Sequence, residues 1–189
     1  KMADSLKQVF YTKAGRKVWS GGGINPDVQI KKESYSSYII ALYQQDQFFL
    51  FVNDWLSKNP SIVINSDFQA NETLLADFSK WLEAKNFHYQ TIAEVQLDSI
   101  KATCYKERSF ETVKTEWQAL LNKIALAKKN DIAINKEMIK NALEMELIGR
   151  FAYSKGKIVH YMKKDKDVVK ALELLEQPAL IAPILHPKK

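Results

Sequence analysis

The chain has 189 residues, a net charge of +6, 46% hydrophobic residues and 26% charged residues. This composition is typical of a folded, soluble domain with a substantial core, and it excludes disordered and membrane-spanning chains, because the richest apolar run, FFLFV at 48–52, is far shorter than the roughly 18–20 residues of a membrane helix. Lysines alternate with Asp and Glu and no DNA- or RNA-binding signature occurs, so nucleic acid is not an expected partner.

The first 30 residues have the pattern of a small β-structure. The runs LKQVFYT at 6–12 and KVW at 17–19 flank Gly15, and this spacing predicts a hairpin whose turn uses the positive φ that glycine adopts easily. A glycine-rich loop, SGGGINP, follows, and 27–30 alternates polar and apolar residues as a half-buried strand does. Such a sheet is marginal by itself, so we expect it to pair with strands from elsewhere.

From Ser34 onward, apolar residues recur with the period of an α-helix. The pattern predicts helices over about 34–58, 73–84, 91–106, 110–129, 135–153 and 165–176. Pro60 and Pro178 mark the ends of the first and last helices, and Gly156 is expected to end the fifth helix as a left-handed residue. The predicted fold is therefore mainly α, a helical bundle of about five to six helices with a short β-type N-terminal extension.

Aromatic residues crowd the first predicted helix, and three of its faces are apolar. The aromatic residues are Tyr35, Tyr38, Tyr43, Phe48, Phe49, Phe51 and Trp55. We expect this helix to be the central helix of the bundle, and the alternative is that a partner protein covers it.

The glycine-rich segment does not match a nucleotide-binding loop. GGGI differs from GxGxxG, and neither Lys-Ser nor Lys-Thr follows Gly23. Ser20 lies beside these glycines, but a nucleophilic serine needs a His or Lys base, and Lys17 is too near in sequence to take that role. A structural role is therefore expected, in which the glycines allow a close approach of the backbone and Pro26 stiffens the exit.

No other side chain forms a recognisable active site or metal site. Cys104 is the single cysteine and is expected to be a small buried hydrophobe. The three histidines are isolated and lack a metal-type spacing such as HExxH: His88, His160 and His186. Glu144 and Glu146 fall on different sides of a helix and form no acid–base couple. The sequence predicts no catalytic residue, no cofactor and no metal in this chain.

The segment FYTKAGRKVWSGGGINPDV at 10–28 resembles the end of the protease domain of the carboxyl-terminal processing serine peptidases, also called tail-specific proteases. In that family, a motif of the type T-x-x-G-R, then G-x-G-I-x-P-D and a hydrophobic residue, closes the catalytic α/β domain. The matching positions are Thr12, Gly15, Arg16, Gly21, Gly23, Ile24, Pro26, Asp27 and Val28. The resemblance is specific over 4–30, and the chain is similar to Bacteroidetes-type members that carry a long helical C-terminal extension.

The resemblance implies that residues 1–33 are the end of a serine protease domain and that 34–189 form a helical C-terminal domain. The family's Ser nucleophile and Lys base lie upstream of the motif, and so does its PDZ domain, so no catalytic residue is carried over to this chain. The implied parent is a periplasmic endopeptidase that binds protein substrates through those domains, with a tail that scaffolds, self-associates or docks an adaptor protein. The alternatives are a free-standing helical binding module without a protease parent and an enzyme complete in these residues.

Overall fold

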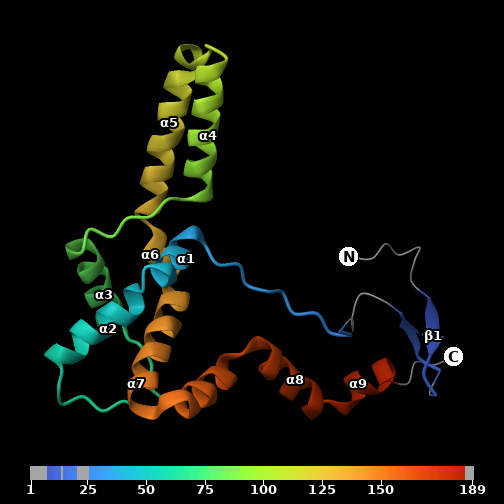
Figure 1. Ribbon diagram of the computed structural model, residues 1–189. Helices are drawn as coiled ribbons and strands as arrows, with labels where there is room; N and C mark the ends of the chain where they lie inside the picture. The colour runs from blue at the N-terminus through green and yellow to red at the C-terminus, as the bar shows by residue number, and fades with distance from the viewer. Residues whose placement is uncertain (1–7, 14, 21–25, 186–189) are drawn as a thin grey trace. The chain divides into compact units, whose positions relative to one another are not determined.

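The computed structural model describes residues 8–13, 15–20 and 26–185 (Figure 1). Over these residues the protein is mainly α, with nine helices and one two-stranded antiparallel hairpin. The elements are β1 (Val9–Tyr11), β2 (Lys17–Trp19), α1 (Ser37–Gln44), α2 (Gln47–Lys58), α3 (Glu72–Ala84), α4 (Ile92–Lys106), α5 (Phe110–Lys128), α6 (Asp131–Ile134), α7 (Lys136–Lys164), α8 (Lys166–Glu176) and α9 (Pro178–Leu185). Contacts divide the chain into a terminal unit, residues 1–33 and 161–189, and a central unit, residues 34–160.

The predicted class is confirmed, but the predicted number of helices is too low. Four predicted helices, 73–84, 91–106, 110–129 and 165–176, agree with α3, α4, α5 and α8 to within one residue at each end. The predicted helix over 34–58 is divided into α1 and α2, and the short helices α6 and α9 were not predicted. The differences lie where a helix is interrupted or very short, and the period of apolar residues is least informative there.

Asp46 interrupts the first predicted helix, because its φ of 54° lies in the left-handed region. α1 ends before this residue and α2 begins after it, so the two short helices each turn an apolar face to one core. Ser36 caps α1, since its hydroxyl accepts the Ile39 N–H at 3.3 Å.

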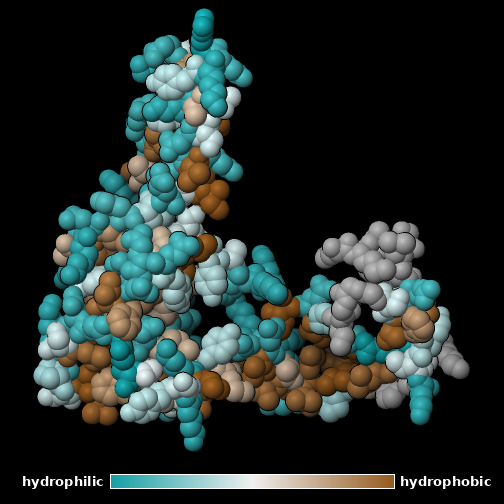
Figure 2. Space-filling model, in the orientation of Figure 1, coloured by the Kyte–Doolittle hydropathy of each residue, from teal (hydrophilic) through white to brown (hydrophobic). Residues whose placement is uncertain are grey.

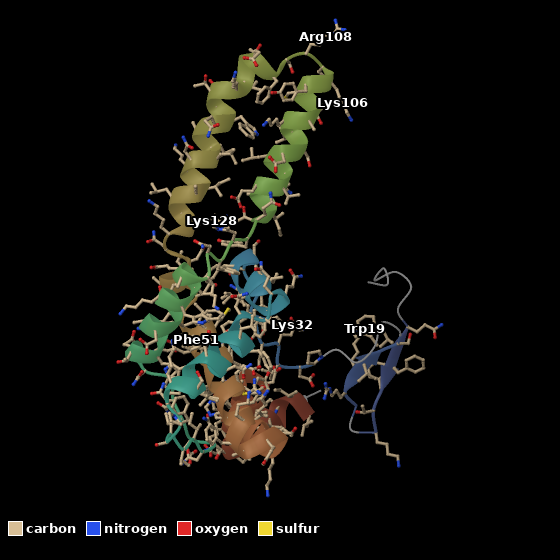
Figure 3. All side chains as sticks on the ribbon, turned by 60° about the vertical axis from the view of Figure 1, so that its left-hand side comes forward. Trp19, Lys32, Phe51, Lys106, Arg108 and Lys128 are labelled. Carbon is tan, nitrogen blue, oxygen red and sulfur yellow. The ribbon has the colours of Figure 1, made fainter. Side chains whose placement is uncertain are left out.

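Aromatic rings form the centre of the central unit. Phe78 of α3 is fully buried, and its ring centre lies 5.3 Å from that of Phe48 and 5.1 Å from that of Phe51. Figure 3 marks Phe51 on α2. Such ring pairs contribute about 0.5–1.5 kcal/mol each beyond the burial of their area. α7 supplies the aliphatic side of the core with fully buried residues that include Ile139, Leu143 and Leu147. Part of the aromatic segment therefore lies at the core, but it is divided between two short helices, and Tyr35, Tyr43 and Phe49 remain exposed.

α4 and α5 form a helical hairpin that extends away from the core of the central unit (Figure 1). Thr91 and Glu94 form a capping box at the start of α4, and Arg108, with a φ of 58°, lies in the turn before α5. Every residue of α4 and α5 is described, and among them Leu97 and Phe110 are the buried ones. The hairpin therefore exposes apolar residues that a helix inside a bundle would bury.

α7 is interrupted at Tyr153, where a φ of 52° and a ψ of −159° leave the helical region. The predicted helix ends at this residue, whereas α7 resumes and continues to Lys164. Gly156 is not the expected left-handed cap, because it is buried inside the resumed helix. A Cβ atom on Gly156 would lie 2.3 Å from Ala152 Cβ and 3.1 Å from Ile148 Cγ2, so glycine is needed here for close packing.

The terminal unit contains the predicted β-hairpin. β1 and β2 are antiparallel, with Phe10 opposite Val18, and each strand has three residues. The expected strand over 27–30 is not formed, because these described residues have bend and irregular backbone conformations. The β-structure in the described part of this unit is therefore a single hairpin.

α8 and α9 have well-defined starts. The Asp165 carboxylate accepts the N–H groups of Asp167 and Val168 at 2.8 and 3.1 Å, and the bond from Val168 is the main reason that the pKa of Asp165 is lowered. Pro178 follows the end of α8, as predicted, and it also begins α9, because proline is tolerated in the first turn of a helix.

Replacing Gly156 with Ala is expected to lower the free energy of unfolding by about 1–3 kcal/mol, because the added methyl group must displace Ala152 and Ile148. Gly149→Ala is the matched control, since its Cβ would meet the flexible end of the Lys157 side chain. Higher helix propensity should make the control neutral or stabilising by up to about 1 kcal/mol. Urea unfolding followed by circular dichroism measures both values, and equal effects would contradict the packing role of Gly156.

Candidate functional site

The motif residues at 12–16 build the turn between β1 and β2. Gly15 has the predicted positive φ, 79°, and its N–H donates to the Thr12 carbonyl at 2.9 Å. The Thr12 N–H donates to the Arg16 carbonyl at 2.9 Å, and the Arg16 N–H donates to the Thr12 hydroxyl at 3.1 Å. Backbone geometry therefore accounts for the threonine and the glycine of the motif.

The Arg16 guanidinium forms an ion pair with the Asp27 carboxylate, so two motif residues that are distant in sequence meet in space. Both side chains are partly exposed, and such a pair contributes about 0–1 kcal/mol of stability. Its main effect is to position the chain that follows the glycine-rich segment. Pro26 is exposed beside Asp27. The other motif residues lie outside the described residues: Gly21, Gly23 and Ile24.

Ser20 closes the open end of the hairpin. Its Oγ accepts the Gln8 N–H at 3.0 Å, and its own N–H donates to the Gln8 carbonyl at 2.8 Å. The hydroxyl therefore extends the pairing of the two strands, which is the structural role expected for Ser20. The rings of Phe10 and Tyr11 are exposed on this hairpin. The ring of Trp19 is exposed as well (Figure 3).

A buried polar pair, which the sequence analysis missed, joins the two halves of α7 across the break. Oε2 of Glu144 lies 2.8 Å from Nε2 of His160, and the two residues are 3% and 4% exposed. Nδ1 of His160 lies 2.9 Å from the Ser66 carbonyl, and Oε1 of Glu144 accepts the Ala70 N–H at 2.9 Å. The pair therefore ties both halves of α7 to the link between α2 and α3.

These hydrogen bonds determine where the protons lie. A carbonyl oxygen only accepts, so Nδ1 of His160 carries a hydrogen, and the contact between Nε2 and the carboxylate requires one proton between them. Both ring nitrogens are occupied, which leaves no lone pair to activate a nucleophile or bind a metal. Glu144 and His160 are therefore a structural pair. Spacing rules could not find them, because their contact depends on the break at Tyr153.

Cys104 is half-buried, not fully buried as expected, and it lines an apolar groove of about 220 Å³ on the α4–α5 hairpin. Other residues of the groove include Leu97, Ile100, Phe110, Val113, Trp117 and Leu120. Lys101 Nζ lies 4.5 Å from the ring centre of Trp117 and 5.7 Å from that of Phe110, which covers part of both rings with a cation. The groove has the character of a protein-binding surface, since most of its lining is apolar and it lies on the surface of the hairpin.

A polar network fixes the base of this hairpin to the core. Lys128 donates to the Tyr89 carbonyl at 2.7 Å and to Glu94 at 3.0 Å, and the Tyr89 hydroxyl donates to the Asp131 carboxylate (Figure 3). Burial, together with Asp131, raises the pKa of Tyr89, so the phenol stays protonated and keeps donating. Burial opposes ionisation of Glu94, but the Thr91 N–H and Lys128 together lower its pKa.

The two remaining histidines are His88 and His186. His88 is exposed, and its carbonyl accepts a hydrogen bond from Gln45 Nε2 at 3.0 Å, while His186 lies outside the described residues. Within the described ranges, no three side chains of His, Cys, Asp or Glu come together in a way that would hold a metal ion. No helix in the same ranges has the length and apolar character needed to cross a membrane.

Residues 38–175 match the family described as the C-terminal helical domain of probable PDZ-proteases. The chain belongs to this family. The match runs from α1 into α8, and so includes the core of the helical domain and its α4–α5 hairpin, whereas β1, β2 and α9 lie outside it. It confirms the coarser part of the resemblance, a helical domain that accompanies a PDZ-protease. Searches of curated proteins and of solved structures found no match.

Glu144→Gln should leave the stability of this helical domain within about 1 kcal/mol of its original value, because the amide oxygen accepts the Ala70 N–H and the amide nitrogen donates to neutral His160. Glu144→Leu leaves the Ala70 N–H and Nε2 of His160 without these partners, and we expect a loss of about 3–5 kcal/mol. Urea unfolding at neutral pH measures both variants. Similar losses for both would show that the hydrogen bonds are not what the domain depends on.

Proposed function

We propose that the chain is the non-catalytic C-terminal region of a carboxyl-terminal processing serine endopeptidase. The observation that carries the proposal is the presence of two separate signals in one chain. The family match over 38–175 supports a PDZ-protease parent, and the motif from Thr12 to Asp27 resembles the end of a protease domain of the Ser–Lys type. The ion pair between Arg16 and Asp27 favours the idea that the two ends of this motif fold together.

The features of the β-hairpin favour the idea that it normally pairs with a larger sheet. A two-stranded hairpin is at best marginally stable in water, and here both strands are short and the rings of Phe10, Tyr11 and Trp19 are exposed. Each strand also has one edge that does not pair in the described part of the chain. Docking of residues 8–20 on the last strand of a preceding protease domain would pair one edge and cover the rings.

The chemistry of the proposed parent lies in residues that precede this chain. A neutral lysine amine removes the proton of the serine hydroxyl, the serine oxygen attacks the peptide carbonyl, and backbone N–H groups stabilise the oxyanion. Burial keeps such a lysine neutral. In this chain, Ser20 Oγ accepts a backbone N–H and both ring nitrogens of His160 are engaged, which supports a tail without its own active site.

Within this proposal, the helical domain docks other proteins through the α4–α5 hairpin. The hairpin extends from the core, its base is fixed by Lys128, and its apolar groove is open to solvent. An adaptor helix or a second copy of the domain would cover the groove residues, which include Ile100 and Leu120. A periplasmic or envelope-associated location belongs to the same proposal and rests on the resemblance.

The 189-residue chain by itself should not cleave an unfolded protein substrate, and the natural polypeptide that includes the preceding protease domain should cleave it. Replacing the serine nucleophile of that domain with Ala should abolish the cleavage, since the base then has no hydroxyl to activate. Gel analysis of the substrate over time measures all three proteins. Cleavage by the chain alone, or a coding sequence without a preceding Ser–Lys protease domain, would contradict the proposed function.

A further inference from the structure

The net charge of the protein lies entirely in its terminal unit. Residues 1–33 and 161–189 contain 13 Lys and Arg against 7 Asp and Glu, whereas the central unit contains 15 of each kind. The central unit is therefore neutral, and the terminal unit carries the whole charge of +6. A unit with this charge attracts anionic partners.

The helices of the terminal unit expose apolar side chains, which are visible as brown atoms over α8 and α9 in Figure 2. None of the residues in these two helices, all of them described, is buried. Leu172 and Leu175 of α8 are 55% and 69% exposed, and Leu180 of α9 is 50% exposed. Val168, Leu172 and Leu175 share one face of α8, which is strongly amphipathic.

α9 is apolar on every side. Its sequence is PALIAPIL, and the chain contains no Asp, Glu, Lys or Arg from Gln177 to Leu185. A helix of this length extends ~12 Å, which is too short to cross the ~30 Å hydrocarbon core of a bilayer. A groove on a protein covers one side of a helix, whereas lipid acyl chains surround it. The all-round apolar surface of α9 therefore suits burial among acyl chains, and the amphipathic α8 before it has the character of a helix that lies at the lipid interface.

Cations precede the apolar helices. Within the terminal unit, Lys163 and Lys164 precede α8, and no acidic residue lies between Tyr161 and Lys164. Two acids of the terminal unit pair with lysines of α8, since Glu173 accepts from Lys170 at 2.8 Å and Glu33 pairs with Lys166. Lysines beside an amphipathic apolar face are the arrangement by which peripheral helices bind anionic phospholipids.

We propose that residues 161–185, the C-terminal arm, bind the surface of an anionic phospholipid bilayer. The leucines of α8 and α9 lie among the acyl chains, and Lys163 and Lys164 lie at the headgroups. The arm has as many acidic residues as lysines, so its insertion depends on the apolar side chains. The positive charge of the terminal unit attracts the chain to the anionic lipid headgroups. Lipid binding goes beyond the proposed function, because neither peptide hydrolysis nor adaptor docking requires it.

Cosedimentation of the 189-residue chain with vesicles tests the proposal. The chain should bind vesicles of phosphatidylcholine mixed with about one third phosphatidylglycerol, and should bind pure phosphatidylcholine more weakly. Leu175→Ser should lower the partition into the mixed vesicles by about tenfold, because one leucine loses its contact with lipid. Leu126→Ser is the matched control, since Leu126 of α5 is 62% exposed but lies in the neutral central unit, and it should bind like the original chain.

A second pair of variants tests the charge. Lys163→Gln with Lys164→Gln should weaken binding to the anionic vesicles by about fivefold per lysine and should leave binding to pure phosphatidylcholine unchanged. Lys106→Gln with Arg108→Gln removes the same charge from the tip of the α4–α5 hairpin and should have no such effect (Figure 3). Circular dichroism of each variant verifies that its helices are retained.

Retention of the chain in the supernatant with anionic vesicles would overturn the proposal, and so would equal binding of Leu175→Ser and Leu126→Ser. Sedimentation equilibrium distinguishes lipid from self-association. A dimer that Leu175→Ser dissociates, without any vesicle binding, would identify a second copy of the chain as the occupant of this surface and would also overturn the proposal. The peptidase assay of the longer polypeptide is independent of these outcomes.

Discussion

The helical domain depends on one buried contact, the pair of Glu144 and His160. α7 changes direction at Tyr153, and the pair holds the two halves of the helix together after this break. The same two side chains satisfy the Ala70 N–H and the Ser66 carbonyl, so the link between α2 and α3 is held at the same place. A buried carboxylate is tolerated here because each of its oxygens has a hydrogen-bond partner. Close packing at Gly156 then completes the joint.

In both the N-terminal motif and the helical domain, residue types that often act in catalysis form structural hydrogen bonds instead. The hydroxyl groups of Thr12 and Ser20 accept hydrogen bonds from backbone N–H groups. Both ring nitrogens of His160 form hydrogen bonds within the core. The proposed parent needs no chemistry from this chain. Within the proposals, the chain extends the sheet of the protease domain, presents the α4–α5 hairpin, and carries the apolar C-terminal arm in a terminal unit of positive net charge.

Local signals in the sequence predicted much of the fold. The helices α3, α4, α5 and α8 were located to within one residue at each end, because the apolar period that predicts each of them lies within the segment itself. The turn at Gly15 was likewise predicted from residues close to it in the chain. The helical part of the sequence showed no diagnostic motif, and the family was identified by the match over 38–175.

The sequence by itself determined the helical class, the ends of most helices, the β-hairpin and the lack of a recognisable catalytic motif, because these follow from residues close together in the chain. Tertiary structure alone decided the breaks at Asp46 and Tyr153, which require positive φ values that only packing elsewhere in the fold can stabilise. It also decided the meeting of Glu144 with His160 and of Arg16 with Asp27. Contacts of this kind depend on how the chain folds back on itself, and no periodicity within a segment encodes that.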